Sequence, residues 1–376
     1  MSALESKIKI ELWSPGGKLL MDITGLASNR SITKVRNDAD QISFDIDLKE
    51  FERLAALMNE DPSTLLIANN TEVRVSSRGV YIAGGQIVQP RGILNPTQEI
   101  IQTKAYGFLN LMSSRFTDYD ELYTAVETTS VVTAQLAYTQ SLPNGNIGIV
   151  VGHVETIGPL TWEFHQQDIK SSWQDLANQQ AGGFDMEITA DKKLNLYALQ
   201  GVHRSDMYLE YGSNIKSVVV DVDGTQSANE IIALGAGIGA QATVQLPIIA
   251  GETQLLPTSA FEQSNPNGVI ALDNVPAQQN TTLLQALTTY NGVSDPNVLL
   301  ASAESDMSAT AYPVTVIQVE YELNGPYLSD ITIGDYIPVD LTKHPYYRGI
   351  KGYYRLEKYE AAIDDEDNVY ATLYLS

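Results

Sequence analysis

Cysteine is absent from this chain of 376 residues. The protein can therefore form no disulfide, no thiolate metal site and no cysteine nucleophile. Histidine is scarce as well, and His153, His165, His203 and His344 form neither an HExxH motif nor a close pair that would hold zinc. No G-x-S-x-G motif marks a serine nucleophile. We therefore expect no catalytic residue, no cofactor-binding residue and no metal ligand, and we predict that the chain is not an enzyme.

Long hydrophobic runs are also missing. The stretches "IGIVVG" and "ALGAGIGA" fall far short of the roughly 20 apolar residues that a membrane-spanning helix requires. The N-terminus, "MSALESKIKIELWSP", lacks the apolar core of a secretory signal. We predict a soluble protein that is made in the cytoplasm and does not insert into a membrane.

Basic residues are few. Lys and Arg number 23 against 46 Asp and Glu, which gives a formal net charge of −23. Nucleic-acid binding needs a basic surface, so we predict no specific nucleic-acid binding. The acidity fits two interpretations: it keeps the protein soluble, or it lets a surface lie close to DNA without binding it.

Strand and helix patterns are clear in the stretch "VRNDADQISFDIDLKEFERLAALMN", residues 35–59. Apolar residues alternate over 42–48, which is typical of a strand with one buried face. They then recur at i, i+3, i+4 and i+7 over 51–58, which is typical of an amphipathic helix. Asp47, three residues before Glu50, is placed to cap that helix, so a strand is predicted to run directly into it.

In the first two thirds of the chain, the sequence predicts mainly strands at first and then a mixture of helices and strands. In residues 1–115 we predict further strands at 8–12, 72–76, 79–83, 85–89 and 98–106, and a short helix in "YGFLNLMSSRF". The segment 116–143 is predicted to be helical, with a Thr117–Asp120 capping box ahead of "ELYTAVE" and a second helical stretch in "SVVTAQLAYTQ". Residues 168–199 predict helix, strand, tight turn and strand, with Gly182 and Gly183 ending the helix.

From about residue 213 the pattern returns to β. The sequence "VDGTQ" predicts a hairpin between two strands, and the closing part predicts a run of antiparallel strands. Residues 240–305 read as an insertion or a long crossover with a helical patch in "TTLLQALTTY". We therefore predict a β-rich α+β fold with domains at 1–115, 116–212 and 213–376, the last with an insertion near 240–305.

Three motifs have both a functional and a structural interpretation. Gly235–Ala240, "GAGIGA", faintly resembles a dinucleotide loop, but no parallel βαβ unit surrounds it and a strand-end loop is favoured. Asp364–Asn368, "DDEDN", lacks calcium-loop spacing, so we predict a solvated hairpin turn. Trp13, Trp162 and Trp173, with 20 Tyr, fit sugar stacking, but an interface or half-buried sheet is favoured.

The order of these segments resembles a known family. "RNDADQISFDIDL", "TEVRVSSRGVYIAGGQI" and "TKAYGFLNLMSSR" are similar to the N-terminal barrel of phage tail hub proteins. "SSWQDLANQQAGGFDMEITADKKLNLY" resembles their medial helix and hairpin, and "NIKSVVVDVDGTQSANEIIALGAG", "IGDYIPVDL" and "YYRLEKYEAAIDDEDNVYATLYLS" resemble their second barrel. The family comprises the baseplate hubs of contractile tails and the hub-like N-terminal regions of siphophage tail-associated lysins.

The resemblance implies two tail-tube-like antiparallel β-barrels with a small α/β segment between them, and a homotrimeric ring with pseudo-sixfold symmetry. It implies a structural virion protein of the tail tip or baseplate, assembled in the host cytoplasm and carrying no catalytic residues. Implied partners are hexameric distal tail or tail tube proteins, tail-tip spike or fibre proteins and the C-terminus of a tape-measure protein. Two alternatives stay open, a hub that cleaves peptidoglycan and a carbohydrate-binding adhesin.

A channel for DNA benefits from an acidic lining, because negative charge repels phosphate. We therefore predict that some of the surplus acid faces the ring's lumen, with Asp45, Asp47, Asp221 and Asp223 as candidates.

Overall fold

The structure is a computed structural model. It describes residues 8–96, 98–117, 120–165, 167–178, 183–234 and 328–376. Between 235 and 327 it describes residues 243–244, 248–249, 268–273, 282–289, 303–304, 306–307 and 309–322. The motif at Gly235–Ala240, and Gly182 among the predicted helix-ending glycines, lie outside the described residues.

The secondary structure is mostly strand. The helices are α1 (Leu48–Leu57), α2 (Thr128–Ser141) and α3 (Ile169–Ala177), with short 3₁₀ helices at Pro62–Thr64, Phe108–Ser114 and Leu328–Asp330. None of the helices described is long and apolar enough to cross a membrane.

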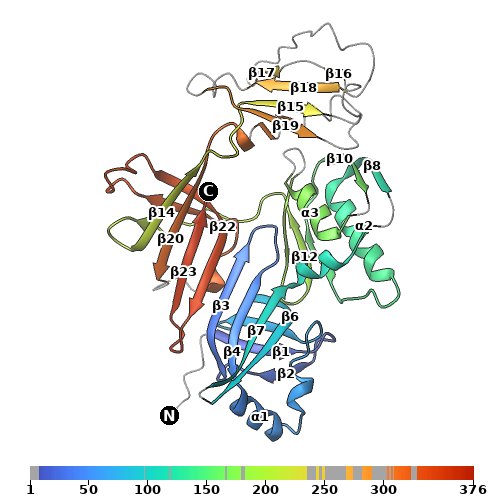
Figure 1. The fold of residues 1–376 in the computed structure, drawn as a ribbon, viewed down its shortest axis with the longest axis vertical. Coiled ribbons are helices and arrows are strands. Elements are labelled where there is room, and N and C mark those ends of the chain that lie inside the picture. Colours follow the sequence, from blue (N-terminus) through green and yellow to red (C-terminus); the bar gives the residue numbers. More distant parts are fainter. Residues whose placement is uncertain are drawn as a thin grey trace.

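A sheet of thirteen strands forms the body of the molecule (Figure 1). Its strands are β1 (Ile8–Trp13), β2 (Leu19–Asp22), β3 (Ala27–Val35), β4 (Gln41–Asp47), β5 (Glu72–Ser77), β6 (Val80–Asn95), β7 (Gln98–Gly107), β13 (Leu209–Glu210), β14 (Ile215–Asp223), β20 (Val314–Glu322), β21 (Tyr336–Asp340), β22 (Lys351–Ile363) and β23 (Val369–Leu375). Their order is β14-β20-β23-β22-β3-β4-β7-β6-β5-β1-β2, with β21 paired to β22 and β13 paired to β21. All pairs are antiparallel except β13 with β21.

Eight of these strands make two equivalent units of four. In the first, the chain order β3, β4, β6, β7 gives the sheet order β6-β7-β4-β3. In the second, the chain order β14, β20, β22, β23 gives the sheet order β22-β23-β20-β14. The units meet where β3 pairs with β22. The central sheet is therefore an internal repeat, in which β3, β4, β6 and β7 correspond to β14, β20, β22 and β23.

Finer features repeat as well. An extra strand, β5, pairs with the first half of β6, and β21 pairs in the same way with the first half of β22. The register shifts between Ile87 and Gln89 on β6, and at the corresponding place between Leu356 and Lys358 on β22. Both units thus share strand order, direction and an irregularity at the same position.

Three smaller sheets accompany the main sheet among the described residues. The medial segment, shown in green in Figure 1, holds the pair β8 (Asp120–Glu127) and β10 (Pro159–His165), and the sheet β11 (Asp185–Ile188), β12 (Lys193–Tyr197) and β9 (Val150–Val154). Between β14 and β20 the chain builds a five-stranded sheet from β15 (Glu230–Leu234), β16 (Thr243–Val244), β17 (Ile248–Ile249), β18 (Gly268–Asp273) and β19 (Gln285–Thr289).

Among the described residues, two hydrophobic clusters form the cores of the main sheet and of the medial segment. The first draws on both repeat units, from Ile8 on β1 to Leu375 on β23, so the beginning and the end of the chain share one core. The second belongs to the medial segment and is centred on Trp173, which is fully buried and donates its indole N–H to Gln135 at 3.0 Å. A buried indole with a satisfied N–H is a packing residue.

The strand that runs into a helix is confirmed. Ile42, Phe44 and Ile46 are buried on one side of β4, and α1 begins directly afterwards with Phe51 and Ala55 buried. The Asp47 carboxylate accepts the Glu50 N–H at 2.9 Å, as an N-cap does. The Glu50 carboxylate, however, contacts Arg53 at 2.8 Å.

Four local predictions are wrong. "ELYTAVE" is strand β8, because it pairs with β10, and the cap of α2 is Glu127. "TTLLQALTTY" contains strand β19, because its threonine-rich end pairs with β15. "VDGTQ" joins no hairpin, because β14 pairs with β20 and β15 pairs with β18 and β19. The strands predicted at 79–83 and 85–89 are one strand, β6.

The β-rich α+β class, with a large antiparallel sheet, is confirmed. The hairpin turn at Asp364–Asn368 is confirmed too, because it joins β22 to β23 and Asp364 accepts the Asn368 N–H at 2.8 Å. Within the described residues the main sheet is open, with β14 and β2 at its two ends, so the two barrels remain a prediction.

Candidate functional site

The accessible side of the central sheet is mainly polar. Strand alternation buries Ile42, Phe44 and Ile46 on the inner side and leaves Ser43 and Asp45 on the outer one. Hydroxyl, amide and charged side chains occupy the outer positions across all eight repeat strands: Ser31, Thr33, Gln41, Ser43, Asp45, Gln89, Arg91, Gln102, Lys104, Ser217, Asp221, Gln318, Glu320, Lys358, Glu360 and Thr372. We call this side the open face.

The open face has two shallow hollows, one mainly in each repeat unit. The first, of about 480 Å³, is lined by Asn29, Asp45, Arg91, Gln102 and Lys104 among others. The second, of about 360 Å³, is lined by residues that include Lys216, Glu320, Glu360, Tyr370 and Thr372. The polar walls of the first hollow suit a hydrated surface better than a pocket for an apolar ligand, whereas Ala361, Ala362 and Ala371 make the second hollow more apolar.

The four predicted channel acids lie on strands β4 and β14. Asp45 accepts a hydrogen bond from Asn29 at 2.8 Å, and Asp221 is exposed. Asp47 and Asp223 end their strands and accept local backbone N–H groups at 2.9 and 2.8 Å. The first two are therefore available to line a surface, whereas the other two also stabilise a helix start and a turn.

Cations share the open face with these acids. Lys358 is paired with Glu360 at 2.6 Å, and the Lys216 ammonium lies 5.3 Å from the centre of the Tyr370 ring. Lys104 and Arg91 lie in the hollow of the first unit. The open face therefore carries both signs of charge.

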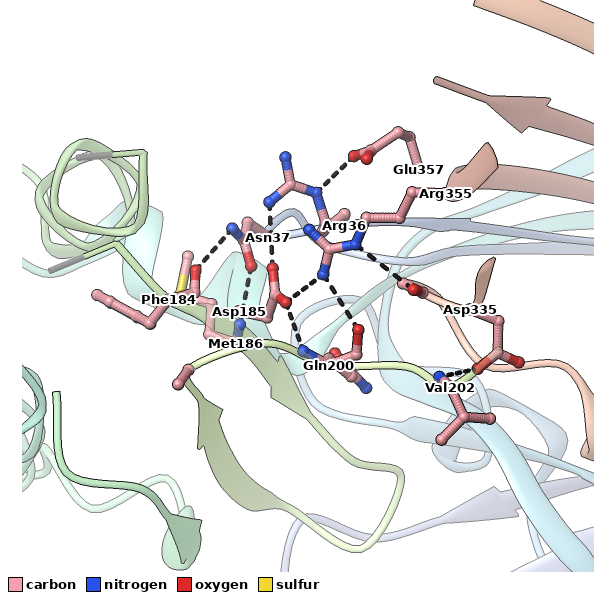
Figure 2. Close-up of polar contacts among 12 residues, drawn as sticks. Arg36, Asn37, Phe184, Asp185, Met186, Gln200, Val202, Asp335, Arg355 and Glu357 are labelled. Atoms are coloured by element: carbon pink, nitrogen blue, oxygen red, sulfur yellow. Dashed lines mark hydrogen bonds and ion pairs between the residues drawn. The ribbon is translucent and has the colours of Figure 1, made fainter. Parts of the chain in front are cut away.

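A buried ionic joint connects the open sheet to the medial segment (Figure 2). Asp185, at the start of β11, accepts from Arg36 at 3.1 Å and from Arg355 on β22. The backbone N–H of Gln200 donates to the same carboxylate at 2.6 Å, and Arg36 continues to Glu357 at 2.5 Å. Residues from both repeat units and from the medial segment thus converge on one carboxylate.

Asn37 reinforces the joint beside Asp185. Its backbone adopts a φ of +54°, a left-handed conformation that asparagine tolerates better than most residues. The buried side chain donates to the Phe184 carbonyl at 3.1 Å and accepts the Met186 N–H at 2.8 Å (Figure 2). Asn37 therefore pairs with the backbone on either side of Asp185, as a neighbouring strand would.

Asp335 connects the joint to the linker that follows β12. Its carboxylate accepts the Val202 N–H at 3.0 Å and the Arg204 guanidinium at 3.1 Å. Beside it the backbones of Gly201 and Gly334 approach so closely that a Cβ on Gly201 would lie 2.1 Å from the Gly334 carbonyl carbon. The linker after β12 is thereby pressed against the loop before β21.

A second charged cluster lies under the joint. The Lys34 ammonium donates to the Ile82 carbonyl at 3.1 Å and lies 3.6 Å from Asp40, next to a small cavity of about 30 Å³ that Glu187 also lines. Burial, together with Glu187 and Asp38, raises the pKa of Asp40 to about 6, although Lys34 acts in the opposite direction. The Lys34 ammonium therefore lies beside two carboxylates, Asp40 and Glu187, and Glu187 belongs to the medial segment.

The carboxylates of the medial segment have structural partners. Glu127 caps α2, accepting the N–H groups of Thr129 and Ser130, and also accepts the Ile157 N–H at 2.8 Å. Burial acts to raise its pKa, but hydrogen bonds from the Ser130 and Thr129 hydroxyls, together with those from the Ile157 and Ser130 N–H groups, lower it to about 2. Asp168 caps α3 by accepting the Ser171 N–H at 2.9 Å. Glu127, with its lowered pKa, serves poorly as a general acid.

The histidines lie apart. His153 contacts Glu155 at 3.2 Å, His203 stacks on Tyr336 at 4.8 Å between ring centres, and His344 stacks on Tyr347 at 5.0 Å. The backbone of His165 lies in β10. In the part of the chain that the structure describes, no three His, Asp or Glu side chains gather as metal ligands would.

The predicted sites thus do not coincide with the joint. The joint is formed by Arg36, Asn37, Asp185, Asp335 and Arg355, and none of these residues was predicted from the sequence as part of a site. The only local signal is Asp185 in "FDMEI", where a carboxylate sits between apolar residues that are also buried.

No protein-family model and no curated protein matches the chain. Solved structures do. A 43 kDa tail protein of prophage MuSo2 from Shewanella oneidensis has a TM-score of 0.65 at 12% identity, with 98% of each chain covered. A tail protein from Neisseria meningitidis has a TM-score of 0.64 at 14% identity, covering 98% of this chain and 96% of its own.

Prophage tail protein gp18 from Listeria monocytogenes has a TM-score of 0.58 at 12% identity, covering 97% of this chain and 94% of its own. These proteins define the class: the chain has the fold of phage tail proteins over nearly its full length. These three structural neighbours are tail proteins, in line with the tail hub resemblance seen in the sequence.

Proposed function

We propose that this chain is the structural subunit of a tail-tip or baseplate hub, and that three copies form a ring. The observation that carries the proposal is the central sheet, which consists of two equivalent four-strand units in one chain. Three such chains present six equivalent units, which is the symmetry needed to dock on a hexameric tail tube or distal tail protein. The fold likeness to phage tail proteins supports the same assignment.

In this ring the open face lines the channel, and each repeat unit corresponds to one of the two tail-tube-like barrels. Its hydroxyl, amide and mixed charged groups keep the wall hydrated, and the surplus acid of the chain disfavours binding of DNA phosphate. The core on the opposite side, shared by both units, keeps the wall rigid.

The medial segment, 116–212, is positioned by the Asp185 joint rather than by a flexible linker. We propose that this segment forms the outer part of the hub. The rim of the hub then contacts tail-tip spike or fibre proteins. A tape-measure C-terminus is a third partner of the hub. All of these contacts place the protein at the tail tip of a virion, as a component without catalytic activity.

Two experiments test the function. Sedimentation of the purified protein measures the number of chains per particle, and three are expected. Incubation with labelled peptidoglycan tests for the alternative lytic role. No release is expected, whereas release that disappears on changing a single medial carboxylate would overturn the non-enzymatic assignment.

A further inference from the structure

The first repeat unit has a small side sheet that the medial segment covers. This side sheet consists of β5 and the first half of β6, where Arg74 lies opposite Gly84. The turn between β11 and β12 packs onto it so closely that a Cβ on Gly84 would lie 2.6 Å from the Cα of Ala190. From the same turn, the Lys192 ammonium pairs with Glu72, which is only 2% exposed. The medial segment therefore buries this part of the first unit.

The equivalent side sheet of the second unit carries exposed tyrosines. It consists of β21 and the first half of β22, where Pro338 lies opposite Tyr353. Tyr353 and Gly84 are equivalent, because each stands three residues before the irregularity that the two units share. Tyr353 is 50% exposed, and Tyr208, directly before β13, is 43% exposed. The second unit thus presents a tyrosine to solvent at the position where the first unit is covered.

Further aromatic rings surround Tyr353. His203 stacks on Tyr336 with 4.8 Å between the ring centres, and it meets Tyr353 edge-on at the same distance. The Tyr208 hydroxyl donates to Asp340 on β21 at 2.8 Å, which fixes its ring beside the strand. We call this surface the tyrosine patch; it consists of His203, Tyr208, Tyr336, Pro338, Tyr353 and the loop 341–350.

The loop 341–350 has no counterpart of similar length in the first unit. It joins β21 to β22, whereas only Arg78 and Gly79 lie between β5 and β6. Tyr346 in this loop is 83% exposed. Its ring meets Tyr347 edge-on at 4.9 Å, and Tyr347 stacks on His344 at 5.0 Å. A ring held in place in this way loses little conformational entropy when a partner binds to it.

The tyrosine patch is also basic, although the chain as a whole is acidic. Five of the chain's 23 basic residues fall within residues 343–358, where an even distribution over 376 residues would place about one. Lys343 and Lys351 already pair with carboxylates, at 2.7 and 2.8 Å. Arg348 is exposed and has no hydrogen bond or ion pair with any residue that the structure describes. Its guanidinium is therefore available to a carboxylate of another molecule.

We propose that the tyrosine patch is the docking surface for an acidic segment of another tail protein. Arg348 pairs with a carboxylate of that segment, and the rings of Tyr346 and Tyr353 pack on its apolar side chains. Tyrosine and arginine are the residue types that dominate the binding energy of protein interfaces. An exposed aromatic surface with a polar rim is typical of such an interface.

The position of the tyrosine patch indicates which molecule it meets. It lies beside the medial segment, because Arg355, two residues after Tyr353, contacts Asp185 in the joint (Figure 2). The inference rests on the proposed hub in one respect, the placement of the medial segment on the outer side of the ring. That placement turns the tyrosine patch towards other tail proteins and away from the channel.

Photocrosslinking in assembled tail particles tests this docking surface. A benzophenone analogue of phenylalanine replaces Tyr353 in one variant and Tyr81 in the matched control. Tyr81 is 42% exposed and lies in the side sheet of the first unit. Irradiation is expected to link position 353 to a protein other than this chain, through a peptide with several Asp or Glu residues. The expected yield of links to other proteins is about tenfold above that at position 81.

The linked species, identified by mass spectrometry, separate the alternatives. A link only to a second copy of this chain, a link only to a glycan, or no link above the control would overturn the docking surface and leave the hub assignment intact. Absence of the chain from purified tail particles would overturn the hub assignment itself.

Substitution of Arg348 tests the charge of the partner. Arg348→Glu is expected to lower the crosslink yield at position 353 about tenfold, whereas Arg348→Lys, which keeps the charge, should retain most of it. Both variants are expected to unfold at the wild-type urea midpoint, because an exposed side chain without an ion pair contributes little to folding. Equal crosslink yields for the two variants would contradict an acidic partner.

Discussion

At the scale of single residues, Asp185 is the most connected side chain of the joint. Removing one partner of a buried ion pair leaves uncompensated charge, which costs about 3–5 kcal/mol. We therefore expect Asp185→Ala, which leaves Arg36 and Arg355 facing each other, to lower the free energy of unfolding by that amount in a urea titration. Asp206→Ala removes an arginine contact at an exposed position and should cost about 1 kcal/mol or less. An equal decrease in the free energy of unfolding for the two variants would mean that the buried joint stabilises the fold no more than an exposed ion pair does.

Gly201 offers a second test at this scale. Gly201 and Gly212 both have positive φ, +98° and +79°, but only Gly201 faces backbone where a Cβ would lie. Gly212→Ala should cost about 1–2 kcal/mol, the usual penalty of a left-handed residue. Gly201→Ala should cost a further 1–3 kcal/mol because the loop at Gly334 must move. Similar unfolding midpoints for the two variants would show that the close approach is relaxed at little cost.

At the scale of elements, β3 and β11 are linked by Lys34, Asp40 and Glu187. The pKa of Asp40 is about 6 in the folded chain against about 3.9 in the unfolded one, so the folded chain binds this proton more tightly. Its contribution to stability is fully present below about pH 4 and is lost as the pH rises through 6. We expect the difference in unfolding free energy between wild type and Asp40→Asn to change by up to roughly 2–3 kcal/mol between pH 4 and 7.

Urea titrations at several pH values measure this difference. Glu187→Gln should move the transition to lower pH, because it removes one of the carboxylates that raise the pKa of Asp40. Asp45→Asn, on the opposite side of β4, is the matched control and should keep the wild-type pH dependence. A pH-independent difference for Asp40→Asn would refute the account of this cluster.

Elements were predictable from the sequence where their cause is local. The alternation in β4, the stripe of α1 and the Asp47 cap depend on residues within one or two turns, and all three are present in the structure. Strands β8 and β19 depend on partners about 40 to 55 residues away, and their own sequences also suit helices. The medial helix and hairpin, α3 with β11 and β12, again have local causes and are confirmed.

The joint was not predictable from the sequence because, like β8 and β19, it depends on residues that are far apart in the chain. Arg36, Asp185 and Arg355 are separated by 149 and 170 residues, and a charged residue in a strand ordinarily indicates an exposed position. Only the tertiary fold brings them together. The repeat is equally hidden, because the inserted five-stranded sheet between β14 and β20 has no counterpart between β3 and β4.

At the scale of the whole molecule, the prediction that acidic residues line the channel has to include basic residues as well. Lys104, Arg91, Lys216 and Lys358 accompany the acids on the open face, so a channel built from it would carry alternating charge. The division into domains at 1–115, 116–212 and 213–376 stays a prediction, and the core shared by both repeat units shows how tightly the first and last of these parts are joined.

The central claim is that three copies of this chain form a ring around a channel lined by the open face. Electron cryomicroscopy of the assembled particle measures the number of chains, their symmetry and the side that faces inward. We predict three chains, six equivalent four-strand units and the side chains of Ser43, Gln102 and Thr372 facing the channel. A ring of six chains, a single chain in the particle, or an open face turned outward would contradict the account.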